Sequence, residues 1–166
     1  IALAETLQER GHKCILITSQ KRVDLELCQS YPELPFLQFP GIGFSKNILK
    51  WPQFFYLQIK NFFFSIHLIN TTQADAIIGF GGFLNAGIVL AAFCLRKFCF
   101  LHEANHVPGK TIRLLSTFAK RIYLPEGVQL KTIFTKTILN CGMPIRKEIQ
   151  KINQEIAKKQ LHFDPA

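Results

Sequence analysis

Acidic residues are scarce in this sequence of 166 residues, which has 11 Asp and Glu against 20 Lys and Arg. The resulting net charge of +9 predicts an anionic partner, such as nucleic acid, anionic lipid or a phosphorylated substrate. Asp and Glu are absent from residues 76–102, so the carboxylate that reads the ribose in a dinucleotide-binding fold is missing. Charged residues make up 19% and hydrophobic residues 48%, a composition that excludes an intrinsically disordered chain.

Metal and redox motifs are missing as well. The sequence has no CxxC pair and no zinc-type spacing of Cys with His, and His102 and His106 lack a suitably spaced third ligand. We therefore expect neither a metal nor a cofactor. The cysteines are interpreted as reduced, mostly buried thiols of a cytosolic protein: Cys14, Cys28, Cys94, Cys99 and Cys141.

Long uninterrupted hydrophobic runs are also absent. The longest apolar stretch, residues 54–69, is too polar for a spanning helix because it contains Gln58, Lys60, Asn61, Ser65 and His67. No secretory signal is visible. The sequence begins with Ile1 rather than Met and opens directly in a helical pattern, so we expect that processing or truncation has removed what came before.

Strand-like and helix-like segments alternate along the chain. The predicted strands are short apolar runs at residues 13–18, 74–80, 98–103, 122–125 and 136–140. The predicted helices cover residues 1–10, 48–70, 88–97, 111–121 and 147–160, and Pro52 is compatible only with a first helical turn. Residues 35–44, rich in Pro and Gly, are expected to be extended on the surface beside the sheet edge. This alternation predicts one α/β domain with a doubly wound parallel sheet.

The first helix and the segment after it form half of a βαβ unit. Gly11 follows the helical spacing of Ile1, Ala4 and Leu7 at the position where helices commonly end, and a buried strand comes next. Because the helix of such a unit follows a parallel strand, we expect the first strand to lie upstream of Ile1. That strand is expected to be central in the sheet.

Polar or glycine-rich segments follow three of the predicted strands, at residues 79–87, 102–109 and 140–146. In a parallel sheet these positions lie at the same edge, which predicts one shared site. Gly79, Gly81 and Gly82 fit either a phosphate cradle at a helix N-terminus or a tight turn. The next segment offers a base, a carboxylate and an amide, or else a structural cap: His102, Glu103, Asn105 and His106. Arg146 can bridge to a phosphate or remain solvated.

Taken together, GFGGFLNAGIVLAA, LHEANHVPG and CGMPIR resemble the amino-terminal half of glycosyltransferase family 28. In that family these segments usually read GxGGYxSGP, HEQNxxxG and GNPVR, and the HE-x-N motif is the most specific of them. The resemblance implies that residues 1–146 are the Rossmann-like, acceptor-side domain of a GT-B enzyme, without its first strand and the GGTGGH loop. Residues 147–166 are then a helical linker toward an absent donor-binding domain.

The resemblance also implies an activity. Family members transfer GlcNAc from UDP-GlcNAc to an undecaprenyl-pyrophosphate-linked muramyl-peptide in peptidoglycan synthesis, a step of cell wall biogenesis that serves cell shape and division. The implied enzyme is an inverting hexosyltransferase, peripheral to the cytoplasmic face of the inner membrane and independent of any cofactor. This chain alone is expected to be inactive because the carboxy-terminal domain is missing.

Site residues carry over only where the motifs match. Asn105 and Arg146 match residues that contact the UDP-GlcNAc donor. The positions implied for the acceptor and its diphosphate are Gly81, Gly82, Phe83, Asn85, His102 and Glu103. The sequence departs from the family pattern at Phe83, Asn85, Ala86, Gly87, Ala104 and Met143. No catalytic base is assigned, because the His of GGTGGH lies outside the sequence and His102 is a weaker substitute.

One predicted helix and its entry loop combine aromatic residues with cations. The residues expected to contact the membrane are Trp51, Phe54, Phe55, Phe62, Phe63, Lys50 and Lys60, and Phe64 and Lys46 lie nearby. Some of these Phe side chains must instead pack on the sheet. A non-catalytic, membrane-recruiting subunit of a split glycosyltransferase remains an alternative. A nucleic-acid partner is not expected, because the basic residues are dispersed and the aromatic residues are mostly Phe.

Overall fold

A computed structural model describes residues 1–45, 47–130 and 137–145. The helices are α1 (Ala2–Glu9), α2 (Arg22–Gln29), η1 (Ile48–Lys50), α3 (Trp51–Thr72), α4 (Asn85–Cys94), α5 (Lys110–Leu115) and η2 (Ser116–Phe118). The strands are β1 (Leu16–Ser19), β2 (Phe36–Phe39), β3 (Ala76–Gly79), β4 (Phe98–His102), β5 (Arg121–Leu124) and β6 (Thr137–Asn140). Their alternation confirms the α/β class.

The described strands form two parallel sheets. One sheet pairs β1 with β2, and the other has the order β3-β4-β5-β6. Within the described residues, β1 and β3 each have a partner on one side only. The parallel pairing confirms the expected type of sheet, and the expectation of a central strand upstream of Ile1 stays a prediction.

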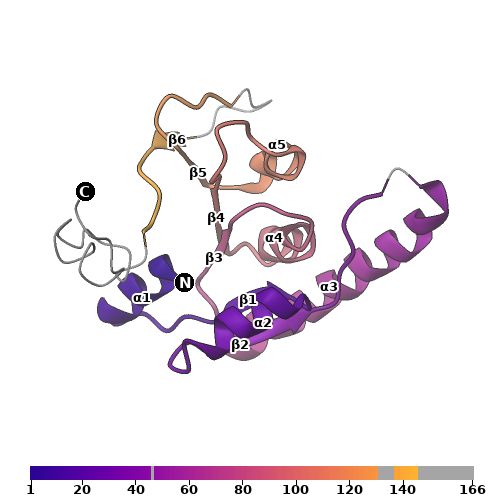
Figure 1. Ribbon diagram of the computed structural model, residues 1–166, viewed down its shortest axis with the longest axis horizontal. Helices are drawn as coiled ribbons and strands as arrows, with labels where there is room; N and C mark the ends of the chain where they lie inside the picture. The colour runs from indigo at the N-terminus through magenta and orange to yellow at the C-terminus, as the bar shows by residue number, and fades with distance from the viewer. Residues whose placement is uncertain (46, 131–136, 146–166) are drawn as a thin grey trace, which may run out of the picture.

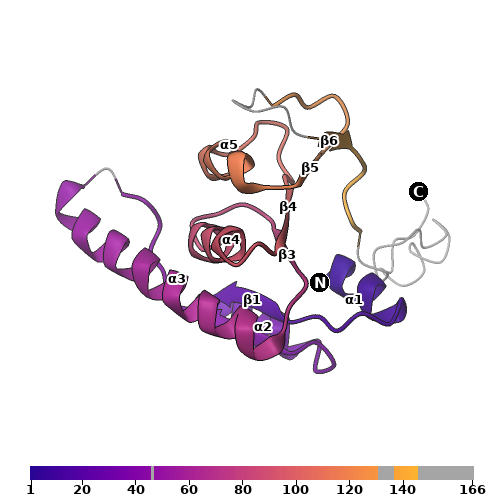
Figure 2. The same ribbon diagram turned by 180° about the vertical axis from the view of Figure 1, so that it is seen from behind.

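The helices cover these sheets unequally. Figures 1 and 2 show α4 and α5 together on one side of the four-stranded sheet, with α1 on the other side. The main core lies beneath α4 and α5, where the fully buried side chains include Val89, Leu101, Ile112 and Ile122. The side of this sheet that faces α1 is less completely filled, and the candidate site lies there.

Helix α3 confirms the long helix predicted from residues 48–70. Pro52 lies in its first turn, and Gln73 ends it in the left-handed conformation with φ +51°. Its buried side carries Asn61, Ser65 and Ile69, and the Asn61 amide donates a hydrogen bond of 2.8 Å to the Pro40 carbonyl. This side packs along α4, while the N-terminal half of α3 projects from the rest of the molecule (Figure 1).

Several boundaries differ from those expected. Residues 35–44, expected at the surface beside the sheet, contain the strand β2, whose Phe39 is fully buried. Helix α2 was not predicted, and only Cys28 of its eight residues is buried. The helix predicted at 111–121 is shorter, since β5 already begins at Arg121. Helix α4 begins at Asn85, inside the expected loop. The predicted helix at 147–160 lies outside the described residues.

Gly87 allows α3 and α4 to approach closely, because a Cβ at this position would lie 3.0 Å from the Phe62 backbone nitrogen. We expect Gly87→Ala to lower the unfolding free energy by about 1 kcal/mol. Crowding of a packed interface costs about 1–3 kcal/mol, and the higher helix propensity of alanine returns only about 1 kcal/mol. Urea unfolding measures the change. Gly43→Ala is the control, since nothing lies within 4 Å of its Cβ position. A more stable Gly87→Ala variant contradicts this interpretation.

Candidate functional site

The three polar segments expected to form one site do meet. Because all strands of the larger sheet are parallel, β3, β4 and β6 end at one edge, at Gly79, His102 and Asn140. A cavity of about 340 Å³ at this edge is lined by residues of all three segments and of the first helix. These residues include Phe80, Ala104, Met143 and Leu3. The predicted proximity of the three segments is confirmed.

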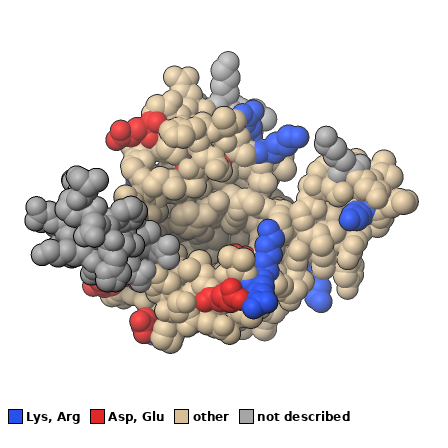
Figure 3. Space-filling model, viewed as in Figure 1, with Lys and Arg blue, Asp and Glu red and all other residues tan. Residues whose placement is uncertain are grey.

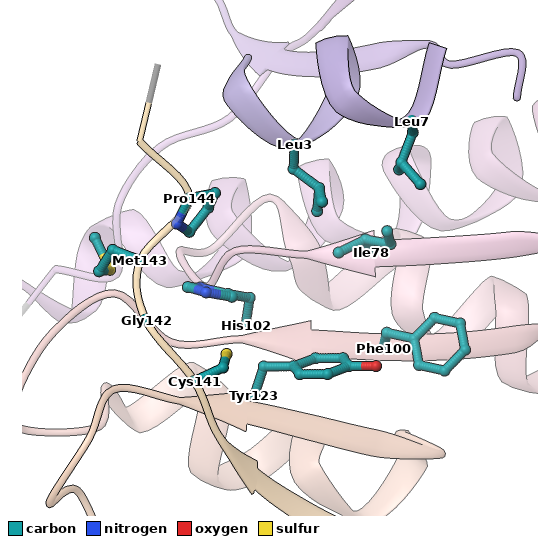
Figure 4. A pocket seen from close by; sticks show the side chains of 10 residues that line it. All are labelled: Leu3, Leu7, Ile78, Phe100, His102, Tyr123, Cys141, Gly142, Met143 and Pro144. Carbon is teal, nitrogen blue, oxygen red and sulfur yellow. The ribbon is translucent and has the colours of Figure 1, made fainter. Parts of the chain in front are cut away.

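Within the described residues, His102 is the only titratable side chain that lines both this cavity and a second one beside it. The second cavity, of about 470 Å³, is otherwise lined mainly by apolar side chains such as Leu3, Ile78 and Phe100 (Figure 4). His102 is 6% exposed, and within the described residues neither of its buried ring nitrogens has a hydrogen-bond partner. The centroids of the Phe80 ring and the His102 imidazole are 5.2 Å apart.

The environment of His102 favours its neutral form. Burial lowers the pKa of His102 below its usual value, and the charge of Glu103 raises it only in part. A neutral imidazole offers one hydrogen-bond donor and one acceptor. His102 therefore has two buried ring nitrogens beside the hollow, and neither has a hydrogen-bond partner within the described residues.

Glu103 follows the last residue of β4, and its N–H still bonds to the Tyr123 carbonyl at 2.9 Å, so alternation of the extended backbone turns its side chain away from that of His102. Glu103 is 2% exposed, and its carboxylate closes the loop that follows β4. Oε1 accepts hydrogen bonds from the Ala104 and Asn105 backbone N–H groups and from the Asn105 side-chain amide, at 2.8–2.9 Å. Oε2 accepts a bond of 2.8 Å from the Gly109 N–H. His102 and Glu103 thus do not act on one ligand from the same side.

The hydrogen bonds to Glu103 decide its protonation state. Burial raises the pKa of this carboxyl, but the donors at Gly109, Asn105 and Ala104 together outweigh burial and hold the pKa below its usual value. Glu103 is therefore an anion at neutral pH. Asn105 is exposed at the tip of the loop, with its side chain bonded to this anion.

The glycine loop after β3 has the backbone geometry that its sequence predicts. Gly81 and Gly82 both have φ +78°, a conformation that other residues rarely adopt. Phe83 lies against the chain at Gly41, where an added Cβ would come within 2.5 Å of the Phe83 ring. The Asn85 side-chain oxygen lies beside Gly79. These residues line neither cavity at His102, so the predicted acceptor residues fall into two groups.

Sequence patterns missed most of the residues that line the larger cavity. Leu3 and Leu7 lie one helical turn apart on the side of α1 that faces the sheet (Figure 4). Their i, i+4 spacing is the signal that identifies this face. Phe100 and Tyr123 follow from strand alternation once β4 and β5 are paired. The patterns along the chain do not show which strands are neighbours.

Two further sequence predictions concern a metal site and the role of Arg146. In the part of the chain that the structure describes, no three His, Cys, Asp or Glu side chains converge in a way that could hold a metal ion. Arg146, predicted to contact the donor, lies outside the described residues. Its role stays a prediction.

The fold and these loops define a class of protein: a parallel α/β domain with polar and glycine-rich loops at the carboxyl ends of its strands. The model of the glycosyltransferase family 28 N-terminal domain matches residues 1–124. The chain therefore belongs to this family.

Relatives and a solved structure agree with this assignment. A protein of Opitutus terrae named UDP-N-acetylglucosamine–N-acetylmuramyl-(pentapeptide) pyrophosphoryl-undecaprenol N-acetylglucosamine transferase is 42% identical over 98% of this chain and 43% of its own length. A protein of the same name from Francisella tularensis is 28% identical over 93% of this chain and 43% of its own. The crystal structure of Acinetobacter baumannii MurG matches 82% of this chain and 39% of that chain, with TM-score 0.67 and 23% identity. The chain thus spans less than half the length of these proteins.

The membrane-spanning potential of the helices agrees with the sequence prediction. Among the described residues, no helix combines the length and apolar character needed to cross a bilayer.

The hydrogen bonds of Glu103 predict an acid-sensitive stabilisation. At pH 7 we expect Glu103→Gln to lower the unfolding free energy by about 1–3 kcal/mol, because buried donors lose their acceptor. Since the folded-state pKa is lowered, the stabilisation is complete above the unfolded value of about 4.3 and is lost as the pH falls through the folded value. The difference between wild type and variant should therefore shrink below about pH 4.3.

Urea unfolding at pH 7, 5, 4 and 3 measures this difference. Glu33→Gln is the matched control, because Glu33 is exposed and no described hydrogen bond involves its carboxylate. A difference between wild type and Glu103→Gln that stays constant from pH 7 to 3 contradicts the assigned role of the carboxylate.

Proposed function

We propose that this chain supplies the acceptor-side half of an inverting N-acetylglucosaminyltransferase. The transferase moves GlcNAc from UDP-GlcNAc to an undecaprenyl-pyrophosphate-linked muramyl-peptide in peptidoglycan synthesis. The observation that carries the proposal is the 42% identity, over 98% of the chain, to an Opitutus terrae protein whose name states this transfer. Because the chain spans 43% of that relative, the proposal requires a second, donor-binding domain.

The proposed reaction uses the loops at the carboxyl edge of the sheet. The acceptor hydroxyl attacks the anomeric carbon of the donor, and UDP leaves as the new glycosidic bond forms. Gly81, Gly82 and Asn85 act toward the acceptor's diphosphate, through N–H groups near the start of α4. Asn105 and Arg146 act toward the donor. The catalytic base is left unassigned, because the polar atoms of His102 are buried in a largely apolar hollow.

A further strand between β1 and β3 is part of the proposal. Both strands have an open edge within the described residues, and all of the ladders are parallel. A right-handed crossover through α1 places a preceding strand beside β1. Such a strand would unite the two sheets into the doubly wound, Rossmann-like sheet of a GT-B domain over residues 1–146, followed by a linker at 147–166. Its terminal loop would also reach the unpaired nitrogens of His102.

Completion of the chain in two stages tests the proposal. The first protein is the chain itself, the second adds the strand and GGTGGH loop with which family members begin, and the third also carries a donor-binding domain. We expect the second protein to be more stable in urea than the first, because it pairs two open strand edges. Of the three proteins, we expect only the third to incorporate labelled GlcNAc from UDP-GlcNAc into a polyprenyl-linked acceptor.

Each contrary result has a distinct meaning. Turnover by the chain alone refutes the half-enzyme proposal, and no gain in stability from the added segment refutes the intervening strand. A third protein that is folded and membrane-bound but does not transfer GlcNAc favours the alternative of a non-catalytic, membrane-recruiting subunit.

We also propose that the projecting end of α3 contacts an anionic membrane, as expected for a peripheral protein of the cytoplasmic membrane face. An apolar patch of exposed side chains covers this end and the segment before it: Phe44, Ile48, Leu49, Phe55, Tyr56, Ile59 and Phe63. Phe55, Ile59 and Phe63 are spaced four residues apart and share one side of the helix, away from the buried side that carries Asn61, Ser65 and Ile69. Single exposed apolar residues are common, but a continuous patch indicates an interaction surface.

The charges around the apolar patch favour lipid as its partner. Lys50 and Lys60 are exposed within it, and Asp and Glu are absent from residues 34–74. Figure 3 shows the projecting end with cations and without a carboxylate on the visible face. Cations next to an apolar surface fit anionic headgroups above acyl chains.

The other predicted membrane residues support the patch or lie beneath it. The Trp51 indole N–H donates to the Ser45 carbonyl at 3.0 Å, and its ring packs on Phe44. Phe54 also contacts the Phe44 ring. Phe62 is half-buried and packs against the main core, so the proposal gives it the smallest part in lipid contact.

Matched leucine variants test the membrane proposal. Leu49 in the apolar patch is 83% exposed and Leu114 on α5 is 70% exposed, so neither substitution removes a buried contact. We expect Leu49→Glu and Phe63→Glu to weaken binding to vesicles of phosphatidylglycerol and phosphatidylethanolamine by about tenfold or more, because an apolar contact is lost and a like charge is added. Leu114→Glu should bind as wild type does.

Vesicle co-sedimentation measures the binding. If Leu49→Glu and Leu114→Glu weaken vesicle binding equally, the apolar patch is not the surface that contacts the membrane. If the wild-type protein binds oligonucleotides but not these vesicles, the membrane proposal is wrong and the partner is a nucleic acid.

A further inference from the structure

The glycine loop after β3 is held by a neighbouring segment of the chain. Gly81 and Gly82 have no side chains with which to fix their own positions, and both lie in the left-handed region. The next two residues supply the contact instead. A Cβ built on Gly41 would come within 2.5 Å of the Phe83 ring and within 2.7 Å of a Leu84 methyl group. The glycine loop therefore rests on Gly41 through these two side chains.

Gly41 contributes space rather than an unusual backbone conformation. Its φ angle lies outside the left-handed region, so alanine can adopt the same backbone. The added methyl group would nevertheless displace the Phe83 ring and the Leu84 side chain. Phe83 is half-buried and lines neither cavity at the carboxyl edge. Its ring thus packs on the chain at Gly41 and not in either cavity.

The connecting segment, residues 39–45, contains Gly41 and is bonded to α3 near both of its ends. The Asn61 amide donates to the Pro40 carbonyl at 2.8 Å, and the Trp51 indole N–H donates to the Ser45 carbonyl at 3.0 Å. Because both bonds come from one helix, the connecting segment keeps a fixed place relative to α3.

The connecting segment also carries part of the apolar patch. Phe44 is exposed, and its ring packs against Trp51 and Phe54. Three residues of fully extended chain span at most about 11 Å, so the backbone of Phe44 lies within that distance of Gly41. The glycine loop and the proposed membrane contact are therefore joined through one short segment.

A lipid-linked substrate makes this short connection meaningful. The acceptor proposed above carries its diphosphate between a polyprenyl chain and a sugar. The chain lies in the hydrocarbon core, so the diphosphate lies in the headgroup layer, which is about 5–8 Å thick on each side of a bilayer. A loop that receives this diphosphate has to lie at the height of the headgroups while the apolar patch contacts the same membrane.

We infer that the packing of Phe83 and Leu84 on Gly41 is a joint that sets the height of the glycine loop above the membrane, with Phe83 as a positioning residue. This role rests on the proposed function, since it assumes that the glycine loop receives a lipid-linked diphosphate and that α3 contacts the bilayer. Phe83, which the family motif implies as an acceptor contact, then acts through the glycine loop instead.

Acceptors with and without a membrane anchor distinguish positioning from direct contact. GlcNAc transfer by the two-domain protein proposed above is measured with a polyprenyl-linked acceptor in vesicles of phosphatidylglycerol and phosphatidylethanolamine, and with a short-chain, water-soluble acceptor. We expect Gly41→Ala and Phe83→Ala to raise the KM for the embedded acceptor about tenfold, because small misplacements of a binding group have effects of this size. The KM for the soluble acceptor should change far less, because that molecule can adjust its height freely.

Other kinetic constants and a matched variant serve as controls. In both variants, kcat, the KM for UDP-GlcNAc and vesicle co-sedimentation should stay as in wild type. Gly43→Ala makes the same chemical change two positions from Gly41, where nothing lies within 4 Å of the Cβ position. It should transfer GlcNAc to both acceptors as wild type does.

A double-mutant cycle in the chain itself tests the joint without any acceptor. We expect Gly41→Ala to lower the free energy of unfolding, and to lower it less in the Phe83→Ala background, because removal of the ring makes room for the added methyl group. Urea unfolding measures the four free energies. If Gly41→Ala alone fails to fold, a folded double variant demonstrates the same compensation.

Three results overturn this role. Equal increases in KM for the embedded and the soluble acceptor make Phe83 a contact of the acceptor itself. An unchanged KM for the embedded acceptor in both variants shows that the joint does not set the height of the loop. Equal effects of Gly41→Ala with and without the Phe83 ring show that there is no joint.

Failure of the proposed function gives a different result. A folded two-domain wild type that transfers GlcNAc to neither acceptor refutes the proposed function and the height-setting role with it. The double-mutant cycle then still decides whether Phe83 packs on Gly41, because it requires no substrate.

Discussion

Parallel pairing of β3, β4, β5 and β6 is the constraint on which the candidate site depends. Parallel strands need a crossover after each strand, so every strand of the larger sheet ends at the same edge. Residues 79–87, 102–109 and 140–145 are brought together for this reason, although up to about sixty positions separate them in the sequence. The chain stays extended for one residue beyond β4, where the Glu103 N–H bonds to the Tyr123 carbonyl, and alternation then turns the His102 and Glu103 side chains to opposite sides. One residue contributes to a ligand-sized hollow and the next one organises a loop.

Helix α3 combines two surfaces that have different requirements. Its inward side contains the polar pair Asn61 and Ser65, which are fully buried because each makes a hydrogen bond to the backbone. Its outward side is apolar at the projecting end. This distribution is the reverse of an ordinary surface helix. This distribution is expected if the outward side contacts lipid rather than water. The inward side lies close to the backbone of α4 at Gly87.

Element types were largely predictable from the sequence, and the relations between elements were not. Apolar runs predicted β1, β3, β4, β5 and β6, and the position of Pro52 predicted the start of α3. Helix α2 escaped because its eight residues make only about two helical turns, fewer than an average helix has. The site segments were predictable from strand ends. The four donors converging on Glu103 were not, since they depend on how the chain returns at Gly109.

The open edges of β1 and β3 have a consequence for the chain in isolation. An unpaired strand edge offers free N–H and C=O groups to any extended segment that approaches it, and natural proteins usually cover or charge such edges. Here both edges border apolar side chains, including Ile17 of β1 and Ile77 of β3, which pack against the core. Two copies of the chain can therefore pair through these edges, so self-association in concentrated solution would involve β1 and β3 of the described residues.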